Sequence, residues 1–368
     1  MIRLAIAAAS GSYEALIASG LIERAGAQLR QTLGERFSSA LFVVTVAPVR
    51  RKLGRKLMRS LSAAGFQAKL IEMPDGESAK KLATVEQLAD KLIRLAADRD
   101  AVLVAFGGCV VGDVTGLLAS LYMRGVGLIQ IPTTVLAQVD ASIGGKTGVN
   151  LRAGKNLLGT FHPPRVVLMD PAVLSTLPDR EFRAGLYEAL KCGVIGRPEL
   201  FGRLENANVR SLRRDPAWLE WVITESVKLK AEVVSNDERE GGLRRVLNFG
   251  HTIGHALEAD SGYRRFLHGE AVAWGMVAEA HIARAQGQCD GVTAQRIIDA
   301  VLALGPLPKV TARSCDVLRL LQTDKKTRSG TVHFVLPRQI GRVQVVNNVP
   351  EKVIIGAVDE LRRMVRRN

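Results

Sequence analysis

The stretch NFGHTIGHA at residues 248–256 places two histidines, His251 and His255, four positions apart. On a helix this spacing puts both imidazoles on one face, as a shared metal ion would require. A third histidine, His268, follows in LHGEAVAWGM, and the chain contains only six histidines. Two histidines and one carboxylate would complete a catalytic zinc site with an open position for substrate. Glu188, in AGLYEALKCGVI, is the best candidate carboxylate, because an unpaired charge on such an apolar stretch would be costly.

An alternative interpretation makes Glu188 a structural residue. Lys191 follows it by three positions and shares its helical face, so the two side chains could form a buried ion pair. The histidines would then be structural as well. Spacing alone leaves both interpretations open.

A glycine-rich turn, FGGCVVGDVTG at 106–116, follows the apolar run AVLVAF and leads into a helical stretch. Glycines there let the backbone approach a pyrophosphate closely, and the N-terminus of the following helix presents free N–H groups to it. The motif PTT at 132–134 adds hydroxyl groups after the next strand, at the edge where α/β ligands gather. The alternative is a tight strand–helix turn that binds nothing.

A second glycine-rich stretch, ASIGGKTGVNLRAGKN at 141–156, carries Lys146, Lys155 and Asn156. Cations beside flexible backbone amides suit a phosphate group, whereas the alternative is a basic surface loop. Because GKT here lacks the upstream glycine spacing of a P-loop, a nucleoside triphosphatase is excluded. Other basic side chains that either face a binding cleft or are solvated are Lys228, Lys230, Arg244, Arg245 and those of DKKTRSG at 324–330.

Short apolar runs in the first part of the chain predict buried strands, and stretches with helical periodicity alternate with them. This alternation predicts a parallel α/β sheet. The predicted strands are 40–46, 68–73, 101–106 and 126–131, and the predicted helices between them are 49–64, 78–97 and 113–121.

After about Pro164 helical stretches dominate, apart from a predicted hairpin at 332–337 and 343–348. His162-Pro163-Pro164 reads as a hinge. We therefore predict an N-terminal Rossmann-like parallel-sheet α/β domain over 1–164 and a mainly α-helical C-terminal domain over 165–368. The active site is expected in the cleft between them.

The chain has 368 residues, a formal net charge of +15 and 5% aromatic residues. Its basic residues are spread along the chain without interleaved aromatics, which favours solvated basic faces and an anionic small substrate over nucleic-acid binding. The four cysteines form no CxxC pair, which indicates reduced thiols in a cytoplasm. No apolar run approaches the ~20 residues that span a bilayer, so we expect neither a membrane nor a nucleic acid as partner.

Taken in order, these motifs resemble the 3-dehydroquinate synthases, which belong to the sugar-phosphate cyclases. The resemblance runs from about Pro74 to Lys326. It implies a dehydroquinate synthase-like fold with NAD and a divalent metal, zinc or cobalt, as cofactors. It rests on GG-x-VVGD-x-TG, YMRG, QIPTT-x-LAQVD, GGKTG-x-N, GKN, LP-x-REFRAGL, E-x-x-K, NFGHT-x-GHA and LHGEAVA.

The resemblance also implies roles for single residues. Glu188, His251 and His268 would bind the metal, and His255 would lie behind the ligands or contact the substrate, which revises the pairing expected from spacing. Around the phosphorylated substrate would lie Lys146, Asn156, Lys191, Lys230, Arg244, Asn248, His255 and Lys326, with Arg124 reaching into the neighbouring subunit of a homodimer. The NAD site would be lined by Asp75, Gly76, Glu77, Lys80, Gly107, Gly108, Cys109 (where the family usually has glycine), Val110, Val111, Gly112, Asp113, Thr133, Thr134, Asp140, Lys146, Lys155, Val173, Leu174, Ser175 and Thr176.

The implied reaction converts 3-deoxy-D-arabino-heptulosonate 7-phosphate into 3-dehydroquinate and phosphate, in the shikimate pathway of aromatic amino-acid biosynthesis. One alternative is a sister cyclase acting on sedoheptulose 7-phosphate or glucose 6-phosphate. Those substrates lack the carboxylate that Lys230 and Arg244 would bind. Another is a metal-dependent glycerol or alcohol dehydrogenase, whose chemistry would give Lys146, Asn156 and Lys191 no phosphate to bind.

Overall fold

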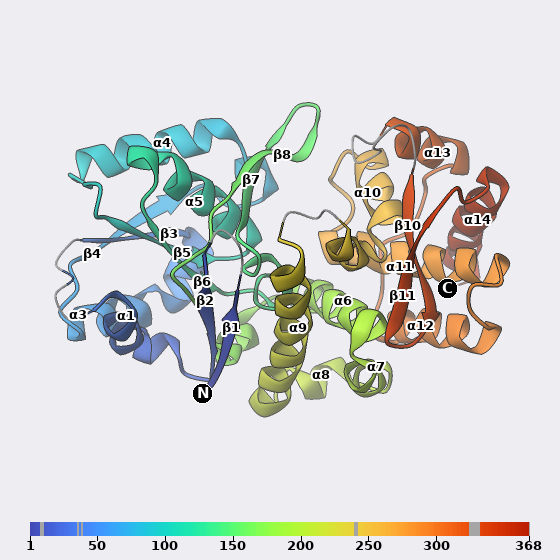
Figure 1. The fold of residues 1–368 in the computed structure, drawn as a ribbon, viewed down its shortest axis with the longest axis horizontal. Coiled ribbons are helices and arrows are strands. Elements are labelled where there is room, and N and C mark those ends of the chain that lie inside the picture. Colours follow the sequence, from blue (N-terminus) through green and yellow to red (C-terminus); the bar gives the residue numbers. More distant parts are fainter. Residues whose placement is uncertain (8–10, 35–36, 38–39, 239–241, 324–331, 368) are drawn as a thin grey trace. The chain divides into compact units, whose positions relative to one another are not determined.

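The computed structural model describes residues 1–7, 11–34, 37, 40–238, 242–323 and 332–367. The chain forms two compact units and passes between them more than once. Unit 1 comprises Met1–Pro178 and Asp215–Glu238, and unit 2 comprises Asp179–Arg214 and Arg239–Asn368. Figure 1 shows the elements of both units.

Unit 1 is built on a seven-stranded sheet with the strand order β1-β2-β9-β6-β5-β3-β4. β1 and β2 are antiparallel, and the other neighbours are parallel. The chain winds outward in both directions from the boundary between β3 and β5, which is therefore the switch point of a doubly wound sheet. The strands are β1 (Ile2–Ile6), β2 (Tyr13–Ile17), β3 (Leu41–Val46), β4 (Ala68–Met73), β5 (Val102–Gly107), β6 (Gly127–Pro132) and β9 (Val166–Met169).

Helices cover both faces of this sheet, α4 and α5 on one face and α3, with α1 beside it, on the other (Figure 1). β3 and β5 are buried along their whole length, which explains why their sequences are continuous apolar runs. The helices are α1 (Ala25–Leu33), α2 (Ala47–Val49), α3 (Arg55–Ala63), α4 (Leu82–Arg94), α5 (Cys109–Leu121) and α9 (Pro216–Asn236), with short turns η1 (Ile22–Arg24), η2 (Arg50–Gly54), η3 (Glu77–Ala79), η4 (Tyr122–Arg124), η5 (Ala137–Ala141) and η6 (Pro171–Thr176).

The second glycine-rich stretch forms a β-hairpin rather than the loop expected from its sequence. β7 (Lys146–Leu151) and β8 (Gly154–Phe161) pair in the antiparallel sense. A Cβ on Gly159 would lie 2.0 Å from the carbonyl oxygen of Thr147, so glycine permits the close approach of the two strands. Thr160 donates a hydrogen bond to Ser120 of α5 at 2.9 Å, which fixes the hairpin to unit 1.

Unit 2 is mainly helical and is organised around α11. Every residue of α11 from Gly269 to Ala283 is buried, as expected for a helix enclosed on all sides. A small hairpin of β10 and β11 confirms the one predicted near the C-terminus. The elements are α6 (Asp179–Gly196), α7 (Pro198–Glu205), α8 (Val209–Leu212), η7 (Leu243–Asn248), α10 (His251–Asp260), α11 (His268–Ala285), α12 (Gly291–Ala303), α13 (Ser314–Thr323), β10 (His333–Gln339), β11 (Arg342–Asn347) and α14 (Glu351–Arg367).

The structure has the predicted fold class, a parallel-sheet α/β part with a mainly helical remainder. The expected boundary after residue 164 is corrected in two respects. β9 pairs with β2 and β6, so the sheet continues past His162-Pro163-Pro164. α9 packs against β1, β2 and η5, so a helix from the second half of the sequence belongs to unit 1. No helix within the described ranges is both long enough and apolar enough to cross a membrane.

Candidate functional site

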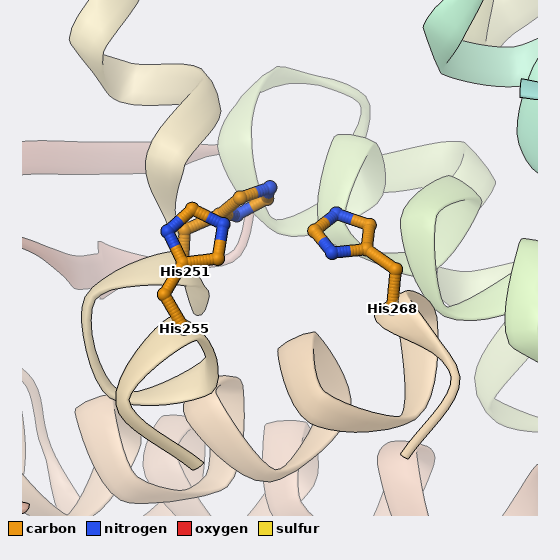
Figure 2. Close-up of side chains that lie close together, drawn as sticks. All are labelled: His251, His255 and His268. Atoms are coloured by element: carbon orange, nitrogen blue, oxygen red, sulfur yellow. The ribbon is translucent and has the colours of Figure 1, made fainter. Parts of the chain in front are cut away.

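Three imidazole rings gather in unit 2 (Figure 2). His251 and His255 lie on α10, and His268 is the first residue of α11. One nitrogen of each ring lies within 4.8 Å of one nitrogen of each of the others. The four-residue spacing on α10 therefore puts both of its histidines on one face, and α11 adds the third.

The Glu188 carboxylate of α6 lies beside two of these rings and is fully buried. Its Oε1 is 3.9 Å from His251 Nε2 and 3.6 Å from His268 Nε2. Ligand atoms about 2.1 Å from a tetrahedral ion are about 3.4 Å apart, so these three atoms are spaced to hold one ion with small adjustments. Within the described residues, neither Glu188 oxygen accepts a hydrogen bond of good geometry. A buried carboxylate of this kind requires a cation.

Lys191 supplies one cation to this carboxylate. Its Nζ lies 2.7 Å from Glu188 Oε2 and donates a hydrogen bond to the carbonyl oxygen of Leu247 at 2.8 Å. The buried Glu–Lys pair considered from the sequence is therefore present. It engages Oε2, while Oε1 faces the histidines, so the ion pair and a metal site are compatible.

The rings of His251 and His268 are oriented through their Nδ1 atoms. His251 Nδ1 lies 3.1 Å from the carbonyl oxygen of Phe249. His268 Nδ1 lies 3.5 Å from Oε2 of Glu258, a buried residue of α10. When Nδ1 carries the proton and donates it, Nε2 has a free lone pair that points toward Glu188, as in metal-binding histidines. Glu258 is absent from the predicted set, although a carboxylate three residues after His255 on an apolar helix was a usable signal.

Most of the residues predicted for NAD lie at the carboxyl ends of the parallel strands of unit 1, whereas Asp140 lies on η5 and Lys146 and Lys155 lie on the β7–β8 hairpin. Residues 75–80 follow β4, and residues 107–113 run from the end of β5 into the first turns of α5. Thr133 and Thr134 follow β6, and residues 173–176 follow β9. Doubly wound sheets bind their ligands at this edge, close to the switch point. The arrangement suits a dinucleotide.

The turn after β5 leads directly into the N-terminus of α5. Gly108 is the N-cap residue and supplies no side-chain hydrogen bond, so the first backbone N–H groups of α5 could bind a phosphate. A Cβ on Gly107 would lie 2.6 Å from Val111 Cγ2, so this position requires glycine. Cys109 begins α5 and is not among the residues with positive φ. Its replacement of a usual glycine therefore causes no backbone strain.

Lys80 links several of the predicted stretches. Its Nζ donates to Asp113 Oδ2 at 2.5 Å and to the Oδ1 of Asn156. Asn150 binds Glu77 Oε1 at 2.7 Å and accepts from the backbone N–H of Asn156 at 2.9 Å. Burial opposes the charge on Lys80, but the Asp113 carboxylate outweighs it and raises the lysine pKa. The β7–β8 hairpin is thus tied to the turns after β4 and β5.

Lys230 and Asp140 form a second, partly buried ion pair in unit 1. Lys230 Nζ lies 2.6 Å from Asp140 Oδ1 and 2.6 Å from its carbonyl oxygen. The family resemblance implied a substrate role for Lys230 and an NAD role for Asp140, and it gave no indication of this contact. Of the other residues predicted for the substrate, Arg124, Lys146 and Asn156 belong to unit 1 and Lys191, Arg244, Asn248 and His255 to unit 2. Lys326 lies outside the described residues.

Comparison with known proteins connects these features to one family. Residues 70–184 match the family model described as 3-dehydroquinate synthase N-terminal, and residues 185–327 match the one described as 3-dehydroquinate synthase C-terminal. The 3-dehydroquinate synthase of Koribacter versatilis (strain Ellin345) is 52% identical over 98% of this chain and 98% of its own length. The chain belongs to the 3-dehydroquinate synthase family.

Solved structures of related cyclases share the fold of this family member. The 2-epi-5-epi-valiolone synthase of Streptomyces hygroscopicus subsp. jinggangensis 5008, with NAD+ and Zn2+ bound, is 33% identical, with a TM-score of 0.86 over 96% of this chain and 98% of that one. A 2-deoxy-scyllo-inosose synthase complexed with carbaglucose-6-phosphate, NAD+ and Co2+ is 26% identical, with a TM-score of 0.87 over 98% of this chain and 100% of that one.

Proposed function

We propose that this chain is a 3-dehydroquinate synthase, a carbon–oxygen lyase that forms 3-dehydroquinate and phosphate from 3-deoxy-D-arabino-heptulosonate 7-phosphate in the shikimate pathway. The observation that carries the proposal is the buried Glu188 carboxylate facing the Nε2 atoms of His251 and His268. In a chain of this family, that cluster offers the metal site that the cyclisation needs.

The proposal assigns zinc or cobalt to Glu188, His251 and His268, and NAD to the carboxyl edge of the sheet in unit 1. The presence of NAD+ with Zn2+ or Co2+ in the two related cyclase structures supports both cofactors. When held by Glu188, His251 and His268, the metal would supply Lewis-acid chemistry for the substrate's C5 oxygen, and NAD at the sheet edge would supply reversible hydride chemistry without net redox change.

Recognition of the substrate's two anionic groups is assigned to basic and amide side chains. Lys146, Asn156 and Asn248 would hold the phosphate, which can itself accept the C6 proton as it leaves. Arg244 would bind the substrate carboxylate bidentately. Lys230, whose ammonium group pairs with Asp140, is proposed to assist.

The change Arg244→Ala is expected to raise KM for the carboxylated substrate more than about tenfold, because a charged hydrogen-bond pair is worth roughly 1.5–3 kcal/mol. Steady-state phosphate release measures this effect. Arg245→Ala is the matched control, since it removes the same charge one residue away. An unchanged KM in Arg244→Ala, or an equal rise in the control, would remove Arg244 from the site.

We also propose that the enzyme is a homodimer in which Arg124 serves the neighbouring subunit. Met123 and Arg124 both have positive φ, 49° and 67°, which is rare in residues other than glycine and marks a specialised turn. Unit 1 also has exposed apolar side chains at the end of α5, on η4 and on β8: Leu121, Met123, Leu157, Leu158 and Phe161. Such surface is expected at a subunit interface.

Leu157→Asp is expected to give a monomer, because a charge in an apolar interface lacks a partner. Sedimentation velocity at several protein concentrations measures the change. Val292→Asp, at another exposed apolar position, should leave the dimer intact. A wild-type chain that sediments as a monomer at assay concentration would refute the dimer.

The four free cysteines of the chain, Cys109, Cys192, Cys289 and Cys315, are consistent with the proposal that the enzyme acts in the cytoplasm, where thiols stay reduced. A disulfide between any two of them in protein isolated without reductant would argue against it.

Phosphate release with NAD supplied, compared between 3-deoxy-D-arabino-heptulosonate 7-phosphate and sedoheptulose 7-phosphate, tests the function. We expect rapid release from the first and little from the second, because only the first offers Arg244 a carboxylate. The sister-cyclase alternative predicts the reverse. Release from neither substrate would reject both assignments.

A further inference from the structure

A buried carboxylate that the reaction does not use lies beneath the start of α10. Glu279 of α11 is fully buried, and its Oε2 accepts a hydrogen bond from the backbone N–H of Gly250 at 2.6 Å. Burial raises the pKa of Glu279 well above its ordinary value, while the nearby backbone N–H groups of Gly250, Ile253 and Thr252 act to lower it. These amides are donors that the first turn of a helix leaves without a partner inside the helix.

Gly250 is the N-cap residue of α10, and because glycine has no side chain, it cannot cap the helix by a side-chain hydrogen bond. In most helices the side chain of a serine, threonine, aspartate or asparagine at the N-cap position accepts a hydrogen bond from the N–H groups of the first turn. Here a carboxyl oxygen from another helix takes that role, because Glu279 Oε2 accepts from the Gly250 N–H.

Close packing of the two helices allows this contact. A Cβ on Gly275 of α11 would lie 1.7 Å from the carbonyl oxygen of Gly250, and a Cβ on Gly254 would lie 2.8 Å from that of Ala271. Gly250 itself has φ 79°, a conformation that favours glycine. These glycines therefore allow α10 to pack closely against α11 at the turn where Glu279 contacts Gly250.

The peptide group between Phe249 and Gly250 connects Glu279 to His251. Its N–H donates to Glu279 Oε2, and its C=O lies 3.1 Å from His251 Nδ1. Because a trans peptide is planar, with N–H and C=O pointing in opposite directions, anchoring the N–H fixes the direction of the C=O. That carbonyl in turn determines which way the His251 ring presents Nε2.

We propose that Glu279 is a positioning residue for the metal site, which holds the Phe249–Gly250 peptide so that His251 Nε2 faces Glu188 Oε1. This inference rests on the proposed metal-dependent function. It assigns Glu279 no contact with metal or substrate, so its effect appears first in metal affinity and only through that in turnover.

The test compares zinc affinity of the full-length protein, by competition with a chromophoric chelator, in wild type, Glu279→Ala and Glu279→Gln. Loss of a residue that orients a metal ligand lowers affinity about 10–100-fold, which we expect for Glu279→Ala. Glu279→Gln keeps an acceptor oxygen, and its affinity should fall less. If the alanine variant does not fold, Glu279→Gln decides, and zinc affinity equal to wild type would overturn the inference.

A structural control separates positioning from general loss of stability. Val301→Ala creates a cavity at a fully buried position of α12 and should lower stability while leaving zinc affinity unchanged. An equal loss of zinc affinity in this control would overturn the inference. Wild-type protein that binds zinc and releases phosphate, with Glu279→Ala binding equally well, would refute the role of Glu279 alone. Wild-type protein that neither binds zinc nor releases phosphate would overturn the proposed function together with it.

Discussion

Glu188→Gln is expected to lower kcat by roughly a thousandfold, because a Lewis acid is worth several kcal/mol and each 1.36 kcal/mol is a factor of ten. The amide is a weaker metal ligand than the carboxylate, and the variant should purify with less zinc. Removal of the charge also leaves the buried Lys191 ammonium, 2.7 Å away, without its carboxylate partner. The measurement is kcat for phosphate release together with the metal content of the same sample.

His268→Asn makes the same test with less disturbance of the core, since its side chain is 31% exposed whereas Glu188 is fully buried. The control is His281→Asn, which changes another histidine of α11 that lies outside the cluster. We expect the control to keep its metal and its turnover.

Chelation should abolish wild-type activity, and zinc or cobalt should restore it. Full turnover after exhaustive chelation would contradict the metal assignment.

Asp113→Ala is expected to destabilise unit 1 by about 3–5 kcal/mol, the usual cost of removing one partner of a buried ion pair. The Lys80 side chain is only 7% exposed, so its ammonium would lose its main counter-charge without gaining water. The raised pKa of Lys80 means that the lysine is charged at neutral pH, so in alkaline solution the stability that the pair contributes is lost as the pH rises through that pKa. In acid the pair is lost when Asp113 takes up a proton, and burial raises the pKa of this carboxyl group. Urea unfolding at pH 7 measures the change.

A double variant identifies the source of this effect. Lys80→Leu combined with Asp113→Leu removes both charges. This double variant should lower the free energy of unfolding less than either single change, because an apolar pair can replace a buried ion pair. Lys56→Ala is the control. It breaks a 2.8 Å ion pair between Lys56 and Glu23, whose side chains are 60% and 59% exposed, and no measurable change in the free energy of unfolding is expected. Additive effects in the double variant would show that the two residues act independently.

Local signals predicted much of the fold. The apolar runs that became β3, β4, β5 and β6 are within one residue of their observed bounds. For β3, β5 and β6 the reason is that strands buried on both faces need apolar side chains throughout, whereas β4 is a partly buried edge strand. β9 has only four residues and follows two prolines, so it gave no comparable signal. The assignment of α9 to unit 1 depends on packing across the chain, which periodicity cannot reveal.

The cluster of histidines with Glu188 was the most predictable part of the candidate site. Four-residue spacing implies a shared helical face for His251 and His255 whatever the tertiary structure, and a charge on the apolar α6 singled out Glu188. Partners distant in sequence were not predictable. Lys230 and Asp140 are 90 residues apart, and Glu279 reaches Gly250 across 29 residues. Such pairs depend on how helices pack, and the sequence shows only that a buried charge needs a partner.

X-ray anomalous scattering from crystals of zinc-loaded, catalytically active protein tests the central claim most directly. A peak about 2.0–2.2 Å from Glu188 Oε1, His251 Nε2 and His268 Nε2 is the expected result. An active, zinc-loaded protein whose peak lies away from these three atoms would contradict it.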